Sequence, residues 1–224
     1  INLSIATVDS GNPNIRTTTI SHIYHEYQNQ LLCGKHALNA VLQYPGASQE
    51  FMNDVGGRIF DKAKIMNSKC RNTFYHKTKG HYNFDVVEEA AKDFGVILHN
   101  VTQEDVHKLK NKAGAPAYIV WTKETGNVAH YYTIRRINGD YWDLDSGLSW
   151  PQRITLSDIE ECMNNHLSRG KGRTVFMKKV ELEKRYYDIL NKNSALMSVT
   201  DSNPCSLDQK GKGHWWVIDV LDEL

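Results

Sequence analysis

The spacing of apolar residues changes in character near the middle of the chain. In the first half, apolar side chains recur at helical intervals, which predicts helices over residues 33–42, 48–64, 84–94 and 102–112. Past residue 115 the runs become shorter and alternate between apolar and polar residues. They predict strands at 117–122, 130–137, 140–144 and 174–180, with one more helix over 156–167. Helices followed by antiparallel strands predict an α+β domain.

Residues with special backbone roles mark the ends of several of these elements. Ser48 stands where the second helix needs an N-cap, and Gly95 suits the left-handed position that often follows a helix. Asn138–Gly139 is a strong signal for a two-residue hairpin. The strands at 130–137 and 140–144 should therefore lie side by side and run in opposite directions.

The two ends of the chain differ from the part between them. Residues 1–21 are rich in Ser, Thr and Asn and form a polar lead-in. Residues 181–224 predict a separate C-terminal extension, with a helix over about 182–199 and a strand-like segment at 215–221. The domain with the clear pattern is thus expected at 22–180. Because the chain does not begin with Met, we expect a fragment or a processed protein.

Composition narrows the classes of partner. The formal net charge is +1 over 224 residues, and Lys and Arg are scattered rather than clustered. Such a small net charge creates no electrostatic field that would attract nucleic acid or an anionic membrane. No run approaches the ~20 apolar residues of a membrane helix. We therefore expect neither a nucleic-acid nor a membrane partner.

The cysteines suggest a reduced, intracellular protein. There are four of them, at positions 33, 70, 162 and 205, and none belongs to a CxxC pair. This spacing argues against a zinc site, and four cysteines in a chain of this length are too few for a disulfide scaffold. We expect no metal and no cofactor.

Cys33 stands at the start of a predicted helix, where backbone N–H groups and the helix dipole stabilise a thiolate. A lone cysteine is more often a small buried hydrophobe. Cys33 is not alone, however, because His130 begins a strand and Asp145 follows across the hairpin. The two hairpin ends should come level, so that the carboxylate holds one imidazole nitrogen and the other faces a thiol. This is the logic of a catalytic triad.

Two neighbouring residues complete or compete with this set. Gln28 lies five residues before Cys33, and its amide could donate to an oxyanion beside the backbone N–H of Cys33. Gln30 is a nearby alternative. Asp143 competes with Asp145, but strand alternation should point it the other way.

Three stretches of the sequence resemble the Josephin family. Residues 23–43 read IYHEYQNQLLCGKHALNAVLQ and match the signature H-E-x-Q-x4-C-x2-H-x-L-N-x2-L-Q. Residues 130–146, HYYTIRRINGDYWDLDS, are similar to H-W-x-x-V-R…W-x-N-L-[ND]-S. Residues 80–87, GHYNFDVV, match the family's G-N-Y-D segment with two substitutions. The resemblance covers about residues 22–180.

This resemblance implies a papain-like Josephin fold, with N-terminal helices packed on an antiparallel sheet and a helical arm inserted at about residues 47–75. It implies Cys33 as nucleophile, His130 as general base, Asp145 as the residue that orients it, and Gln28 as the oxyanion residue. His36 and Asn39 match motif positions that we interpret as packing and hydrogen-bonding residues of the first helix.

The implied activity is deubiquitination by a cysteine-type ubiquitin hydrolase, with ubiquitin or polyubiquitin conjugates as partners. We expect the diglycine tail of ubiquitin to enter a narrow channel lined by Tyr131, Trp142 and Tyr82. The arm could serve as a lid, with the Gly56–Gly57 pair allowing it to flex. We expect a monomer in the cytoplasm or nucleus, or in the host cytosol if the chain is a secreted effector of a pathogen.

Three alternatives remain from the sequence alone. One is another papain-like peptidase of the C39 type, although such enzymes place Asp before the cysteine, where this chain has Leu32. The second is a ubiquitin-binding module that has lost catalysis. The third is an acyltransferase, because transfer to another amine uses the same thioester.

Overall fold

A computed structural model describes residues 19–124, 129–168, 173–197 and 213–220. Its centre is a six-stranded antiparallel sheet in the order β4-β9-β5-β6-β7-β8. The strands are β4 (Val96–Asn100), β5 (Ala117–Glu124), β6 (His130–Ile137), β7 (Asp140–Asp143), β8 (Gln152–Ile154) and β9 (Arg173–Leu182). The helices are α1 (Cys33–Leu42), α2 (Gln49–Met66), α3 (Phe84–Asp93), α4 (Gln103–Lys110), α5 (Leu156–Ser168) and α6 (Lys184–Met197).

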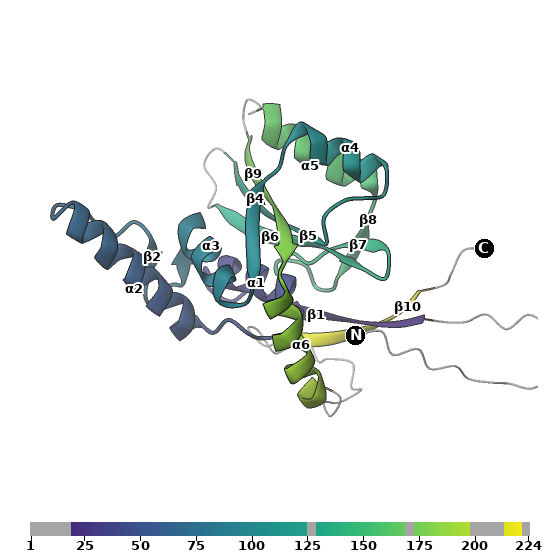
Figure 1. Ribbon diagram of the computed structural model, residues 1–224, viewed down its shortest axis with the longest axis horizontal. Helices are drawn as coiled ribbons and strands as arrows, with labels where there is room; N and C mark the ends of the chain where they lie inside the picture. Colours follow the sequence, from purple (N-terminus) through teal and green to yellow (C-terminus); the bar gives the residue numbers. More distant parts are fainter. Residues whose placement is uncertain (1–18, 125–128, 169–172, 198–212, 221–224) are drawn as a thin grey trace, which may run out of the picture.

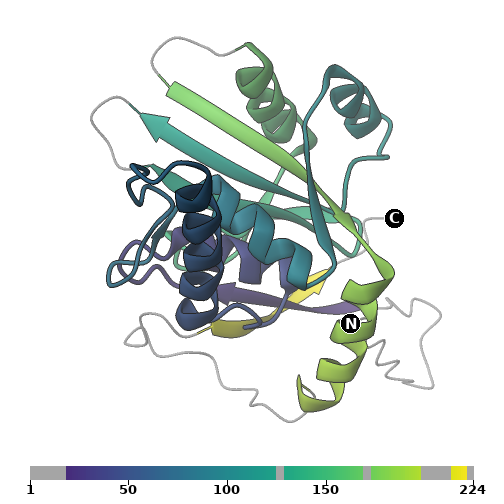
Figure 2. The ribbon, with the colours of Figure 1, turned by 60° about the vertical axis from the view of Figure 1, so that its left-hand side comes forward.

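Helices cover both faces of the sheet. Helices α1 and α3 lie on one side, with α2 next to them, and α4 and α5 lie on the other (Figures 1 and 2). Strand β5 is covered on both faces. Ala117 and Ile119 pack toward α1 and α3, while Tyr118 and Val120 pack toward α4 and α5. A strand buried on both faces is apolar at consecutive positions. The α+β class expected from the sequence is confirmed.

The hairpin between β6 and β7 forms in the expected register. Asn138 and Gly139 have φ angles of 50° and 91°, as a two-residue turn of this kind requires. Ile137 pairs with Asp140, and Ile134 pairs with Asp143. The turn therefore places the start of β6 close to the residues that follow β7.

Helix α1 is fixed across β6 by packing and by one buried hydrogen bond. Nine of its ten residues are buried. The Thr133 hydroxyl on β6 donates to the Ala37 carbonyl oxygen at 2.7 Å. Because that bond ties the middle of the helix to the middle of the strand, it brings the first residue of α1 toward the first residue of β6.

Most of the inserted arm is one unbroken helix, α2. Figure 1 shows α2 projecting from the body, and its far end exposes Ile65 and Met66, which are 87% and 89% exposed. The helix continues without a break through Gly56 and Gly57. A Cβ on Gly56 would lie 2.6 Å from the Tyr75 ring, so this glycine allows close packing rather than bending.

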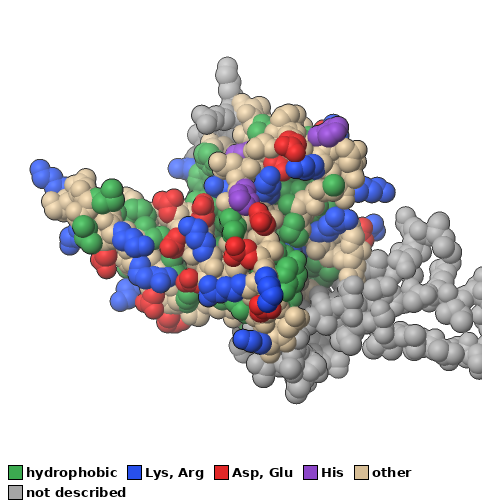
Figure 3. Space-filling view, in the orientation of Figure 1, with side chains coloured by type: hydrophobic (Ala, Val, Ile, Leu, Met, Phe, Trp, Pro, Cys, Tyr) green, Lys and Arg blue, Asp and Glu red, His purple; other side chains and the backbone are tan. Residues whose placement is uncertain are grey.

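The face of the molecule drawn in Figure 3 carries no region of a single charge. Lys and Arg side chains alternate with Asp and Glu side chains over the arm and the body (Figure 3). This mixture agrees with a net charge of +1. Within the described residues, no helix is long and apolar enough to cross a membrane.

The C-terminal extension predicted from residue 181 contacts the rest of the molecule through the two elements that the structure describes, a helix and a strand. Tyr186 of α6 is buried, and its hydroxyl donates to the Leu42 carbonyl oxygen and accepts from the Arg135 guanidinium, both at 3.2 Å. The extension then returns as β10 (Gly213–Val220). This strand pairs antiparallel with β1 (Thr19–Glu26) over eight residues of each, a pairing that the sequence did not predict.

A second small hairpin joins β2 (Tyr75–His76) to β3 (His81–Tyr82).

We predict that Tyr186→Phe lowers the free energy of unfolding by about 1–3 kcal/mol. The reason is that Leu42 is the last residue of α1, and its carbonyl oxygen and the Arg135 guanidinium would each lose a buried partner. Denaturant unfolding measures the difference. Tyr187→Phe is the matched control, because the Tyr187 side chain is half-exposed and should change stability by less than about 0.5 kcal/mol. Equal effects of the two variants would contradict this role of Tyr186.

Candidate active site

Cys33 is the first residue of α1, and its side chain is buried. The preceding residue, Leu32, makes no side-chain hydrogen bond to the helix start, and the first turn contains no acidic residue. The backbone N–H groups of that turn therefore have no capping side chain. Their dipoles favour negative charge on the sulfur or on an oxygen bound beside it.

His130, the first residue of β6, lies between this thiol and a carboxylate. Its Nε2 is 2.6 Å from Asp145 Oδ1, and Cys33 lies close enough to act on the pKa of the imidazole. The hydrogen bond with Asp145, followed by the interaction with Cys33, raises the pKa of His130 above its ordinary value, although burial acts against the charged form. The arrangement therefore favours an imidazolium beside the sulfur. The expected contact between His130 and Asp145 is present, and Cys33 lies beside the same imidazole.

The chain after β7 folds around the Asp145 carboxylate. Asp145 Oδ1 also accepts the Gly147 N–H at 2.7 Å, and the Asp145 carbonyl oxygen accepts the Leu148 N–H at 2.9 Å. A carboxylate held from two sides keeps one orientation toward the imidazole. The turn is thus part of what orients His130.

Asp143 does not point away from this site, so our expectation for it was wrong. Its Oδ1 accepts the backbone N–H of Asp145 at 3.0 Å. Burial, with a smaller contribution from the charge of Asp145, raises the pKa of Asp143 to about 7. The alternation rule fails because β7 ends at Asp143 and the chain turns there. Asp143 therefore supports the backbone of the residue that holds His130.

Gln28 connects the approach to Cys33 with the turn that carries Asp145. Its backbone N–H donates to the Ser146 carbonyl oxygen at 2.7 Å, and its Oε1 accepts the Ser146 hydroxyl at 2.6 Å. Its Nε2 donates to the Gln30 carbonyl oxygen at 2.8 Å, which leaves a second N–H on the same amide. Gln30 takes part through its backbone, with a φ of 50°, and its exposed side chain plays no part in these contacts.

The three residues expected to line a substrate channel lie in the interior. Tyr82, Tyr131 and Trp142 are 1%, 3% and 7% exposed. Tyr82 and Tyr131 pack under the start of α1, next to Gly34. The Tyr82 hydroxyl donates to the Gln49 carbonyl oxygen, which joins β3 to the base of α2. In this conformation their surfaces support the helix start rather than an open channel.

Sequence reasoning missed two residues near this site. Ser146 bonds to Gln28 through both its side chain and its backbone, and Glu26 receives several buried hydrogen bonds from α1. Both occupy fixed positions in the Josephin motifs, next to residues that we had assigned roles. That adjacency was the available signal. In the described part of the chain, no group of three or more His, Cys, Asp or Glu side chains could hold a metal ion.

A cysteine at a helix start, an imidazole beside it and a carboxylate bonded to the imidazole are typical of a site of the cysteine-protease type. The Josephin family model matches residues 28–179 of this chain. The chain belongs to the Josephin family.

Relatives share this family at low sequence identity. An ataxin-3 homolog of Caenorhabditis elegans is 25% identical over 166 residues, which cover 70% of this chain and 49% of that protein. An ataxin-3 homolog of Caenorhabditis briggsae is 24% identical and covers 65% of this chain and 46% of its own length. The chain thus spans about half the length of these relatives. Human Josephin-2 is 23% identical over 173 residues, which cover 73% of this chain and 89% of that protein.

A solved structure is also similar, but its TM-score and sequence identity are too low to support a conclusion about this chain. It is the crystal structure of a double glycine motif protease from an AMS/PCAT transporter in complex with the leader peptide. The TM-score is 0.34 and the identity 16%, over 71% of this chain and 92% of that chain.

We predict that Asp145→Ala moves the alkaline limb of turnover to lower pH. Asp145 is the largest cause of the raised pKa of His130, so without it the imidazolium loses its proton at a lower pH. Asp145→Asn should shift the limb less, because an amide oxygen accepts the same hydrogen bond. The test is the pH profile of turnover, measured from pH 5 to 10 for the wild type and both variants. The alkaline limb of Asp145→Asn should lie between those of the wild type and Asp145→Ala.

The neighbouring carboxylate provides the comparison. Asp143→Asn keeps an acceptor for the Asp145 N–H, and its alkaline limb should stay closer to that of the wild type than the limb of Asp145→Ala. A limb unchanged in Asp145→Ala would remove Asp145 from the role given to it.

Proposed function

We propose that this chain is a deubiquitinase, a thiol-dependent hydrolase of the isopeptide or peptide bond after the C-terminal glycine of ubiquitin. The observation that carries the proposal is the position of His130, which bonds to Asp145 at 2.6 Å and whose pKa is raised by Asp145 and by Cys33. Membership of the Josephin family supports ubiquitin as the substrate rather than an unrelated peptide. The partners proposed are ubiquitin and polyubiquitin conjugates.

In the first half of the reaction, the Cys33 thiolate attacks the glycine carbonyl carbon and forms a tetrahedral oxyanion. The backbone N–H of Cys33 and the second N–H of the Gln28 amide would donate to that oxygen. The His130 imidazolium then gives its proton to the departing lysine amine. The carbon–nitrogen bond breaks, and a thioester remains on Cys33.

In the second half, His130 is neutral and removes a proton from water, which attacks the thioester carbonyl. A second tetrahedral oxyanion forms, and the carbon–sulfur bond breaks to restore the thiolate. The glycine carboxylate leaves with the ubiquitin body. Asp145 stabilises the imidazolium in both halves through its 2.6 Å contact.

The exposed end of α2 is the surface that we propose for contact with the ubiquitin body. Ile65 and Met66 offer apolar side chains there, while the base of the helix packs in the core through Met52 and Val55. An apolar tip on a firmly packed base suits a contact that lies away from the reacting bond.

Ubiquitin with a C-terminal electrophile should label this protein once, at Cys33. Intact-mass analysis should show the addition of one ubiquitin, and Cys33→Ala should abolish it. Cys70→Ser is the matched control and should label like the wild type, because Cys70 lies in the segment after α2 and makes no contact with His130. If another modifier labels the folded protein and ubiquitin does not, the substrate assignment is wrong. Failure with every modifier would favour a binding module.

Gln28→Ala should lower kcat by roughly 10²–10³ with little change in KM, because one oxyanion donor is lost. Gln30→Ala should stay within a few-fold of the wild type, because its carbonyl oxygen remains available to Gln28. Steady-state hydrolysis of a fluorogenic ubiquitin substrate measures both variants. Equal, small effects would exclude Gln28 from the oxyanion site.

A further inference from the structure

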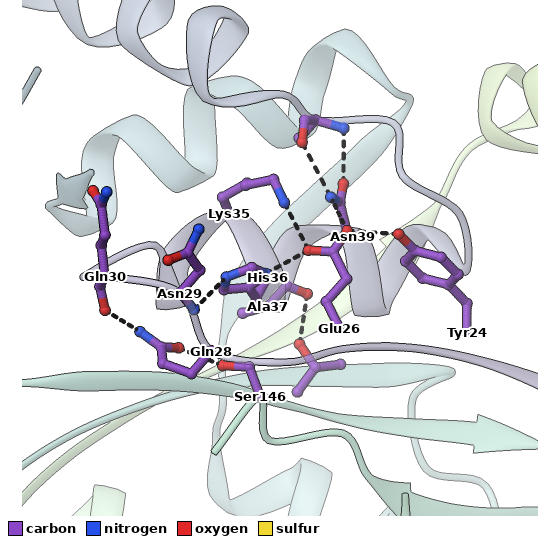
Figure 4. Close-up of polar contacts among 12 residues, drawn as sticks. Tyr24, Glu26, Gln28, Asn29, Gln30, Lys35, His36, Ala37, Asn39 and Ser146 are labelled. Carbon is purple, nitrogen blue, oxygen red and sulfur yellow. Dashed lines mark hydrogen bonds and ion pairs between the residues drawn. The ribbon is translucent and has the colours of Figure 1, made fainter. Parts of the chain in front are cut away.

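A buried carboxylate lies at the end of β1, two residues before Gln28. Glu26 is 4% exposed, and each of its oxygens has two donors from nearby side chains (Figure 4). Oε1 accepts the Tyr24 hydroxyl at 2.6 Å and the Asn39 amide at 2.8 Å. Oε2 accepts Lys35 Nζ at 2.8 Å and His36 Nδ1. Burial alone would raise the pKa of Glu26, but the His36 hydrogen bond and the Lys35 charge outweigh it and lower the pKa to about 2.

This carboxylate sets the protonation of His36. Because Nδ1 faces an ionised carboxylate, Nδ1 is the nitrogen that carries a proton. The other nitrogen, Nε2, lies 3.4 Å from the backbone N–H of Asn29 and can accept it only without a proton of its own. His36 is therefore neutral, with its proton on Nδ1.

The charges around His36 agree with a neutral ring. Burial is the largest influence and lowers the pKa of His36, and the charges of Lys35 and His130 act in the same direction. Glu26 acts in the opposite direction through its hydrogen bond and charge.

Asn29 lies in the loop between β1 and α1 that carries Gln28. The loop is turned tightly at Gln30, whose φ is 50°, and Asn29 O accepts the Leu32 N–H at 3.2 Å. On its outer side the loop is held by hydrogen bonds of Gln28 with Ser146 and of the Leu31 N–H with the Lys79 carbonyl oxygen. His36, from the first turns of α1, holds it from the interior (Figure 4).

We propose that Glu26 and His36 are a positioning pair: Glu26 fixes the tautomer of His36, and His36 Nε2 holds the Asn29 N–H so that the Gln28 amide stays aimed at the oxyanion. The proposal deepens the proposed function and rests on it. Glu26 keeps three other donors when His36 is replaced. The strand–helix junction therefore persists without the imidazole, while the loop loses its interior bond.

His36→Asn separates the two halves of this pair. The Asn amide can replace Nδ1 as a donor to Glu26 but does not reach the position of Nε2. We expect kcat to fall about tenfold with KM within twofold, since small misplacements of a catalytic group reduce the rate at this scale. His36→Gln, whose amide reaches the Nε2 position, should recover most of the loss. His99→Asn is the matched control, because His99 bonds to Glu181 on the exposed surface, and should have wild-type kinetics.

A double-mutant cycle decides whether His36 acts through Gln28. If it does, His36→Asn should change kcat by less than twofold in the Gln28→Ala background. The proposal would be overturned if the two losses in kcat were fully additive, or if His36→Asn changed KM rather than kcat.

Two NMR measurements need no catalysis. In the wild-type protein, the ring nitrogen shifts of His36 should show a proton on Nδ1 and none on Nε2 at neutral pH. The Asn29 amide should exchange with solvent faster in His36→Asn, while the amides of β5 keep their protection. A proton on Nε2, or an unchanged Asn29 amide, overturns the positioning pair even if His36→Asn folds poorly. A wild-type protein that fails to cleave ubiquitin but shows both NMR results would instead overturn the deubiquitinase proposal.

Discussion

The packing of α1 across β6 is the constraint on which the site depends. Thr133 bonds to Ala37 in the middle of both elements, and apolar side chains fill the space on either side. Cys33 is the first residue of α1 and His130 is the first residue of β6, so this one crossing places both side chains. Neither residue needs a loop to bring it into contact. The less regular segments before α1 and after β7 then have to meet that fixed pair, and Gln28 and Ser146 join them.

Two histidines beside this crossing each bond to a carboxylate. On the outer side His130 is matched by Asp145, and on the inner side His36 is matched by Glu26. The two imidazoles are close enough that the charge of His130 disfavours a proton on His36. One histidine can therefore hold charge beside the sulfur while the other remains neutral and structural. Removing Glu26 would leave the buried His36 N–H without its acceptor.

Local signals in the sequence were sufficient for the parts of the site that lie on regular elements. The helix at Cys33, the turn at Asn138–Gly139 and the contact of His130 with Asp145 follow from spacing and turn chemistry. Asp143 was misjudged because alternation holds only inside a strand, and β7 ends there.

The burial of the aromatic residues could not be read from the sequence. Tyr131 and Trp142 are 3% and 7% exposed, and a sequence does not state which layer covers a strand face; their part in a substrate channel stays a prediction. The pairing of β1 with β10 was missed because no local pattern links segments at opposite ends of a chain.

That pairing has a consequence for the order in which the molecule can assemble. Closing a long stretch of chain costs conformational entropy before the contacts it brings can compensate. The ribbon of β1 and β10 cannot form until residue 220 has been synthesised, whereas the central sheet needs nothing beyond residue 182. During translation the sheet and α1 can fold first, with β1 still lacking its partner. Glu26 is the last residue of β1 in this ribbon, so the strand that leads into the site gains its partner only after the sheet beside the site can already be complete.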